Sequence, residues 1–182
     1  ATVVATALHG VGGSLLRKAF LRAGFPMPES VASQQSPHPD VPTVAFPNPE
    51  EPGAMDAVIA LGAARGATLA VANDPDADRL GAAIPTRSGV WRRLSGDEIG
   101  WLLAEHILSR TAGDDRLVIT TLVSSSLLAR IAKAHGVHHR ETFTGFKWIG
   151  RTALDHPQLR FVFGYEQALG YLVATRPLDK DG

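Results

Sequence analysis

Short apolar segments alternate with segments of helical periodicity along the whole chain of 182 residues, and this alternation is the strongest constraint on the fold. Strands are expected at residues 1–6, near 30–34, and at 67–72, 80–84, 117–121, 137–142, 159–165 and 171–175. Helices are expected at 14–23, at 52–66, from Ser95 onward, where Ser95 and Glu98 form a capping-box motif, and at 125–135 and 146–154. Strands that alternate with helices in this way predict an α/β fold.

The chain divides into two halves of similar design. Strands and helices follow one another in a similar order in both halves, although the two sequences show no convincing repeat. We therefore expect two similar small α/β domains, at residues 1–90 and 91–182, each a mixed sheet with helices packed on it. The boundary should fall within 86–94, and the proline-rich stretch 24–52 should form ordered loop rather than a long helix.

Charge and composition exclude several classes of protein. The chain has 18 basic and 18 acidic side chains, so no net charge attracts nucleic acid or a membrane surface. It contains no cysteine, which excludes disulfides, zinc–thiolate sites and a cysteine nucleophile. No apolar run reaches the roughly 18 residues of a membrane span, and the first residues lack the basic region of a signal peptide. We expect a cytoplasmic protein with no nucleic-acid or membrane partner.

Three acidic residues follow an expected buried strand at alternate positions: Asp74, Asp76 and Asp78. Carboxylates held this close repel one another, and a hard divalent cation such as Mg²⁺ removes that repulsion. An EF-hand calcium loop does not fit, because its glycine and glutamate positions hold Arg79 and Pro85. A solvated acidic turn, or a phosphatase that forms an aspartyl phosphate, remains an alternative. Arg79 has two possible roles, a salt bridge within the loop or contact with phosphoryl oxygens.

Other candidate residues lie in loops and at helix starts. Lys147 stands at the start of an expected helix, two residues after Gly145, and is either a phosphate ligand or an exposed surface lysine. Glu166 lies between two strands and could accept hydrogen bonds from sugar hydroxyls or merely decorate a hairpin. His9 lies in a glycine-rich turn, where it could face a ligand or stabilise the turn. The serines 124–126 precede a helix outside any nucleophile-elbow motif, which favours capping.

Seven motifs, taken together, resemble one family, the α-D-phosphohexomutases, which include phosphoglucomutases and phosphomannomutases. In the order of that family, they are ALHGVGG (7–13), FPNPEEPGAMD (46–56), DPDADR (74–79), LSGDEIG (94–100), TGFKWIG (144–150), GYEQALGY (164–171) and DKDG (179–182). The proline-rich motif looks most like the branch that also contains phosphopentomutases. The resemblance implies an enzyme of four domains that transfers a phosphoryl group between the 1- and 6-positions of a hexose phosphate through a hexose bisphosphate.

The resemblance also implies roles for single residues. Asp74, Asp76 and Asp78 would hold Mg²⁺, and Arg79 would lie beside the transferred phosphoryl group. Lys147 would bind phosphate or assist acid–base chemistry, so Arg79 and Lys147 are the implied catalytic residues. The implied substrate-binding residues are His9, Gly164 and Glu166. Gln167 and Ala168 stand where the family usually has a second acidic residue and often a serine, so the resemblance does not fix the sugar.

Two parts of the family pattern have no match in this chain. Neither a phosphoserine loop of the type T-A-S-H-N-P nor a C-terminal phosphate-binding domain is present. We therefore expect the central portion of a mutase, inactive alone, with the N- and C-terminal domains of the whole enzyme as partners. The alternative from another class is a non-catalytic pair of domains that binds metal or a sugar phosphate.

Overall fold

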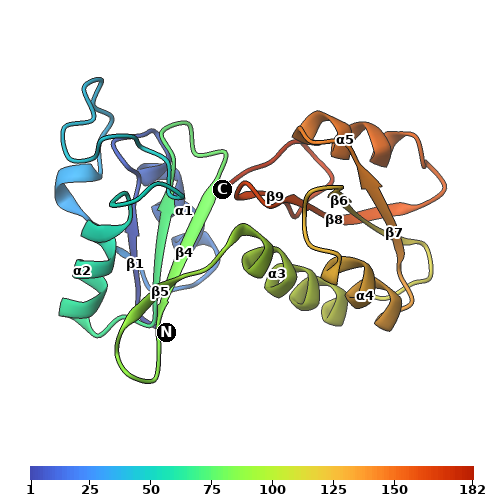
Figure 1. Cartoon of the computed structure of the whole chain (residues 1–182), viewed down its shortest axis with the longest axis horizontal. Helices are drawn as coiled ribbons and strands as arrows, with labels where there is room; N and C mark the ends of the chain where they lie inside the picture. Colours follow the sequence, from blue (N-terminus) through green and yellow to red (C-terminus); the bar gives the residue numbers. More distant parts are fainter. The chain divides into compact units, whose positions relative to one another are not determined.

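The computed structural model describes residues 1–182, which form two compact units, Ala1–Leu94 and Ser95–Gly182. The first unit contains one five-stranded sheet in the order β2-β1-β3-β4-β5 (Figure 1). β1 pairs in parallel with β2 and β3, whereas β4 is antiparallel to both β3 and β5. The elements are β1 (Val3–Thr6), α1 (Gly12–Arg22), β2 (Glu29–Ser30), the 3-10 helix η1 (Ala32–Gln34), α2 (Asp56–Arg65), β3 (Leu69–Asn73), β4 (Leu80–Pro85) and β5 (Trp91–Arg93).

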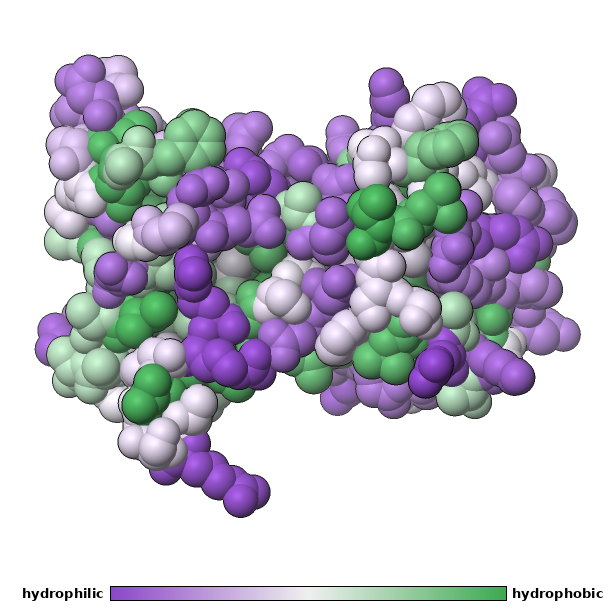
Figure 2. Space-filling model, in the orientation of Figure 1, coloured by the Kyte–Doolittle hydropathy of each residue, from purple (hydrophilic) through white to green (hydrophobic).

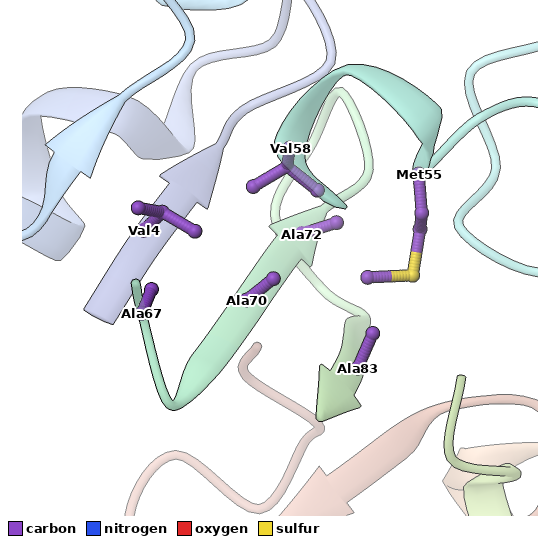
Figure 3. Packing of buried hydrophobic residues seen from close by; sticks show 7 residues of the cluster. All are labelled: Val4, Met55, Val58, Ala67, Ala70, Ala72 and Ala83. Carbon is purple, nitrogen blue, oxygen red and sulfur yellow. The ribbon is translucent and has the colours of Figure 1, made fainter. Parts of the chain in front are cut away.

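The core of the first unit lies between its sheet and α2. Small side chains on β3 and β4 allow the helix to approach closely, and Val58 of α2 is fully buried (Figure 3). Burial of a side chain of this size stabilises the fold by about 1.5–3 kcal/mol. The cluster consists of Val4, Met55, Val58, Ala67, Ala70, Ala72 and Ala83. Side chains alternate across a strand, so Val3 and Leu69 lie on the opposite face, beside α1.

β5 was not expected from the sequence; with it the first unit ends at Leu94, four residues after 90 and at the end of the range 86–94 given for the boundary. It pairs with β4, and the ring of Trp91 packs on Gly62 of α2. A Cβ at Gly62 would lie 2.7 Å from that ring, so only glycine leaves room for it. The strand expected near 30–34 is the two-residue β2 followed by η1.

The second unit contains a four-stranded sheet in the order β7-β6-β8-β9. β6 pairs in parallel with β7 and β8, and β9 is antiparallel to β8. In Figure 1, α5 covers one face of this sheet, and α3 and α4 cover the other. The elements are α3 (Gly96–Arg110), β6 (Arg116–Thr121), α4 (Leu127–Ala134), β7 (His138–Thr142), α5 (Phe146–Leu154), β8 (Arg160–Glu166) and β9 (Gly170–Leu172).

The start of α3 is fixed by a capping box. The Ser95 side chain accepts from the backbone N–H of Glu98, and the Glu98 carboxylate accepts from the backbone N–H of Ser95. The first turn of the helix packs closely against the β8–β9 connection. A Cβ at Gly96 would lie 1.8 Å from the carbonyl oxygen of Gln167, so this approach requires glycine. The capping box expected in this motif is therefore present, and the glycine beside it serves packing.

The two units share one topology, which confirms the prediction of two mixed-sheet α/β domains. In each, a central strand is followed by a helix and an outer parallel strand; the next parallel strand then lies on the other side of the central one. The order in which strands are added thus reverses at β1 and β3 in the first unit and at β6 and β8 in the second, although these strands remain parallel. Ligands of open α/β sheets bind outside the carboxyl ends of strands at such reversal points. The residues after β1, β3, β6 and β8 are therefore the first places to look for a site.

No helix of either unit combines the length and apolar character that a membrane crossing needs. Figure 2 shows hydrophobic residues scattered among hydrophilic ones on the face of each unit that it displays.

Candidate functional site

The loop between β3 and β4 brings three carboxylates together. Carboxylate oxygens of Asp74, Asp76 and Asp78 lie within 4.8 Å of one another. Asp74 is buried, Asp78 is partly exposed and Asp76 is exposed. The loop turns at Ala77, which adopts φ of +60° and donates its N–H to the Asp74 carbonyl oxygen at 3.0 Å. A left-handed alanine is uncommon, so its neighbours must hold it in this conformation.

Arg79 forms the salt bridge that was one of its two expected roles. Its Nε donates to one oxygen of Asp74 at 2.5 Å, its backbone N–H donates to the other at 3.1 Å, and Asp78 lies 3.8 Å away. Asn73 Nδ2 donates a hydrogen bond to the Arg79 carbonyl oxygen at 3.0 Å. Burial alone would lower the pKa of Arg79, but the hydrogen bond and charge of Asp74 raise it. Burial raises the pKa of Glu50, against the attraction of nearby Arg79.

The donor set of this loop fits a hard divalent cation. Three carboxylates supply only oxygen ligands, which suits Mg²⁺ or Mn²⁺. Arg79 offsets one of the three negative charges, so a divalent cation would find two further charges to neutralise. Both oxygens of Asp74 accept from Arg79 and the side chain is buried, which argues against Asp74 as a nucleophile.

His9 lies in the turn after β1 and is buried within a polar network. Its Nε2 lies 2.8 Å from Thr43 Oγ1, which also accepts from Gln34 Nε2 at 2.8 Å. Gln34 Oε1 in turn accepts from Thr6 Oγ1 at 2.6 Å. His9 has φ of +63° and is only 4% exposed. These contacts match the turn-stabilising role that the sequence left open.

In the second unit, Glu166 ends β8 and is nearly buried. It faces Gly170 across the hairpin, and the short connection turns at Leu169 with φ of +63°. Glu166 Oε1 accepts from Lys180 Nζ at 3.4 Å. Sequence reasoning gave Lys180 no role, although it lies in the quoted DKDG motif. The backbone N–H of Asp181 donates to the Tyr171 carbonyl oxygen and thereby ties this terminal segment to β9.

Lys147 and Gly164 occupy different environments. Lys147 is the second residue of α5, is exposed, and has its Nζ 5.6 Å from the centroid of the Trp148 ring. Gly164 is buried inside β8, where a Cβ would lie 2.7 Å from Ile149 of α5. Gly164 thus allows α5 to pack closely on the strand that carries Glu166. Because β6, β7 and β8 are parallel, the start of α5 and Glu166 lie at the same edge of the sheet.

The residues around Glu166 are held by a further network. Tyr165 donates its hydroxyl to Asp97 at 2.7 Å, and Asp97 also accepts the backbone N–H of Ser125. Burial, with the hydrogen bond to Asp97, raises the pKa of Tyr165. Ser124 Oγ accepts the backbone N–H of Gln167 at 3.2 Å, and Ser125 Oγ accepts that of Leu127. Ser125 thus binds the first N–H of α4, although the N-cap residue itself, Ser126, makes no side-chain cap, and Ser124 binds the backbone of the β8–β9 hairpin.

Comparison with known protein families decides what these two units are. Residues 1–89 match the domain described as "Phosphoglucomutase/phosphomannomutase, alpha/beta/alpha domain II", and residues 95–182 match the one described as domain III. The chain belongs to the phosphoglucomutase/phosphomannomutase family. The resemblance inferred from the seven motifs is confirmed, and the chain corresponds to the two central domains of that family.

Curated members of this family resemble the chain over nearly its full length. A probable phosphomannomutase of Haemophilus influenzae is 44% identical over 180 residues, which are 98% of this chain and 36% of that protein. A phosphopentomutase of Homo sapiens is 42% identical over 190 residues, or 98% of this chain and 31% of that protein. The chain thus spans about a third of the length of these relatives.

A solved structure supports the fold. The crystal structure of a putative phosphomannomutase from Thermus thermophilus superposes with a TM-score of 0.81 at 24% identity, covering 100% of this chain and 39% of that one.

Proposed function

We propose that this chain is the central portion of a Mg²⁺-dependent phosphohexomutase, which moves a phosphoryl group between the 1- and 6-positions of a hexose phosphate through a hexose bisphosphate. The observation that carries the proposal is the convergence of three carboxylates at the reversal point of a unit that belongs to this family. A cation bound there would neutralise charge on the transferring phosphoryl group. Asp74, Asp76 and Asp78 would hold it, each through a carboxylate oxygen.

Arg79 would contact the transferred phosphoryl group directly. Its hydrogen bonds to Asp74 use Nε and the backbone N–H, so both terminal guanidinium nitrogens remain available for phosphoryl oxygens. Asp74 therefore orients the guanidinium. The same contact keeps Arg79 charged, since it raises the pKa of that group.

The second unit would recognise the sugar phosphate. Glu166 would accept hydrogen bonds from sugar hydroxyls, and Lys180 on one of its oxygens restricts its orientation. Lys147 lies at the start of a helix with no side-chain cap, where free backbone N–H groups and a lysine favour a phosphate. Relatives named for mannose phosphate and for pentose phosphate are 44% and 42% identical to this chain, so overall identity does not choose between these sugars, and the hexose is part of the proposal.

Mn²⁺ titration of the purified chain, followed by electron paramagnetic resonance, tests the cation site. Asp76→Asn should weaken Mn²⁺ binding by at least the roughly tenfold that loss of an outer partner of a metal costs. Asp40→Asn, at an exposed loop position, is the matched control and should leave binding unchanged. Equal affinities for the unaltered chain and Asp76→Asn would contradict the assignment.

Turnover tests the remainder of the proposal. The chain alone, supplied with glucose 1-phosphate and glucose 1,6-bisphosphate, should show negligible mutase activity, because the phosphoserine loop of the family is missing from it. The same residues inside the whole enzyme should turn over, and Glu166→Gln there should raise KM. Full activity of the isolated chain would refute the proposed division of roles.

A further inference from the structure

The glycine-rich turn at residues 9–13 packs against the acidic loop, residues 74–78. A Cβ at Gly10 would lie 2.3 Å from both Cα and the carbonyl oxygen of Pro75, a distance that no real side chain tolerates. The backbone N–H of Val11 donates to that same oxygen at 2.8 Å. A Cβ at Gly12 would lie 2.8 Å from Cβ of Ala77. The turn therefore touches the two residues that separate the three aspartates.

The turn that provides this support is itself held in place. The backbone N–H of His9 donates to Gln34 at 3.0 Å, and the His9 carbonyl oxygen accepts from His38 at 3.0 Å. Leu8 and His9 both have positive φ, and the His9 ring is fixed by Thr43. These bonds join the turn to η1 and to the proline-rich segment, so a displaced Pro75 could not be accommodated by movement of the turn alone.

We propose that this turn sets the cation affinity of the acidic loop, with Gly10 as a positioning residue that acts through Pro75 and does not touch the cation. The inference rests on the cation site proposed above. Mg²⁺ and Mn²⁺ require their oxygen ligands in a narrow geometry, and three carboxylates within 4.8 Å repel one another when no cation is bound. A fixed support under the intervening residues holds the aspartates together against that repulsion.

Three glycine variants of the whole chain separate positioning from stability. Gly10→Ala forces Pro75 to move and should weaken Mn²⁺ binding by about 10- to 100-fold, the usual effect of losing an outer partner of a metal site. Gly12→Ala comes closer than 3.0 Å only to the Ala77 methyl group and should have a smaller effect in the same direction. Gly24→Ala is the control: it strains a residue with φ of +75°, yet nothing lies within 4 Å of the added carbon.

Mn²⁺ affinity from electron paramagnetic resonance and urea unfolding are measured on all three variants. We expect Gly24→Ala to lower stability without changing Mn²⁺ affinity, and the other two to weaken affinity in the order given. Should Gly10→Ala not fold, Gly12→Ala against Gly24→Ala decides the question. Unchanged affinity in Gly10→Ala or, where that variant does not fold, in Gly12→Ala, or an equal loss in Gly24→Ala, would overturn this inference alone. Failure of the unaltered chain to bind Mn²⁺ would overturn the proposed cation site as well.

Discussion

Replacement of Arg79 by methionine should destabilise the first unit and should make its stability depend on divalent cations. Arg79 is the guanidinium that pairs with Asp74, whose side chain is only 2% exposed, whereas Arg79 is 25% exposed. Methionine keeps much of the side-chain volume and removes the charge. Asp74 would then retain the Arg79 backbone N–H as a donor, but it would lose the Nε contact at 2.5 Å.

The size of the effect follows from the burial of the pair. Loss of one partner from a fully buried ion pair costs about 3–5 kcal/mol, because it leaves a buried charge uncompensated. Arg79 reaches solvent, which screens the pair, so we expect a smaller loss of about 2–3 kcal/mol for this variant. A cation on the loop supplies the missing positive charge. At a free Mg²⁺ concentration 100 times its Kd, binding restores about 2.7 kcal/mol.

Trp91 makes the measurement specific to one unit. It is the only tryptophan of the first unit, so a background of Trp101→Phe and Trp148→Phe gives a fluorescence signal from Trp91 alone. Urea unfolding is measured with and without Mg²⁺, for the Arg79→Met variant and for Arg79→Met with Asp74→Asn. The double variant should recover stability without Mg²⁺ and should lose the response to it. If Arg79→Met alone unfolds at the urea concentration of the unaltered chain, Asp74 does not depend on Arg79 and the reasoning is refuted.

Three further predictions concern the second unit. Arg116→Met should lower the free energy of unfolding by about 3–5 kcal/mol, because the buried guanidinium donates to the backbone carbonyls of Leu108, Thr111, Gly113 and His135. Arg160→Met, at an exposed ion pair, should lower it by about 1 kcal/mol or less, and equal unfolding midpoints for the two variants would contradict this prediction. Gly164→Ala should cost about 1–3 kcal/mol through its contact with Cγ2 of Ile149, and unfolding measurements should show a smaller cost in an Ile149→Ala background, which lacks that carbon. Burial lowers the pKa of His139, so protonation favours the unfolded state and stability should fall as pH drops below about 6.5; His139→Gln should flatten that part of the stability–pH curve, and an unchanged slope would exclude His139 as the cause.

Local signals in the sequence predicted the parts of the fold that depend on near neighbours. The capping box at Ser95 and Glu98 involves residues three apart, and both of its hydrogen bonds are present. α5 begins and ends where glycine and the apolar spacing predicted. β5 escaped prediction because its three residues are held by pairing with β4 and by the contact of Trp91 with Gly62, both of which are long-range.

In the candidate site, too, features set by near neighbours were predicted and features set by long-range contacts were not. The spacing of the three aspartates was sufficient to predict that their oxygens converge, since a strand end and one turn bring them together. The burial of His9 could not be predicted, because it depends on Thr43, 34 residues away. Lys180 was missed for a similar reason, since it reaches Glu166 only after the chain has crossed β9. The salt bridge of Arg79 with Asp74 likewise needed coordinates, because the sequence allowed the same side chain either role.

The acidic loop and the Glu166 hairpin occupy equivalent places in the two units. Each joins the last parallel strand to the antiparallel strand beside it, β3 to β4 and β8 to β9. A hairpin tip can change length or composition without altering the parallel pairing behind it. Under the proposed function, substitutions at residues 167–169 would change sugar preference without altering the acidic loop, and one ancestral scaffold would in this way yield catalysts for different sugars.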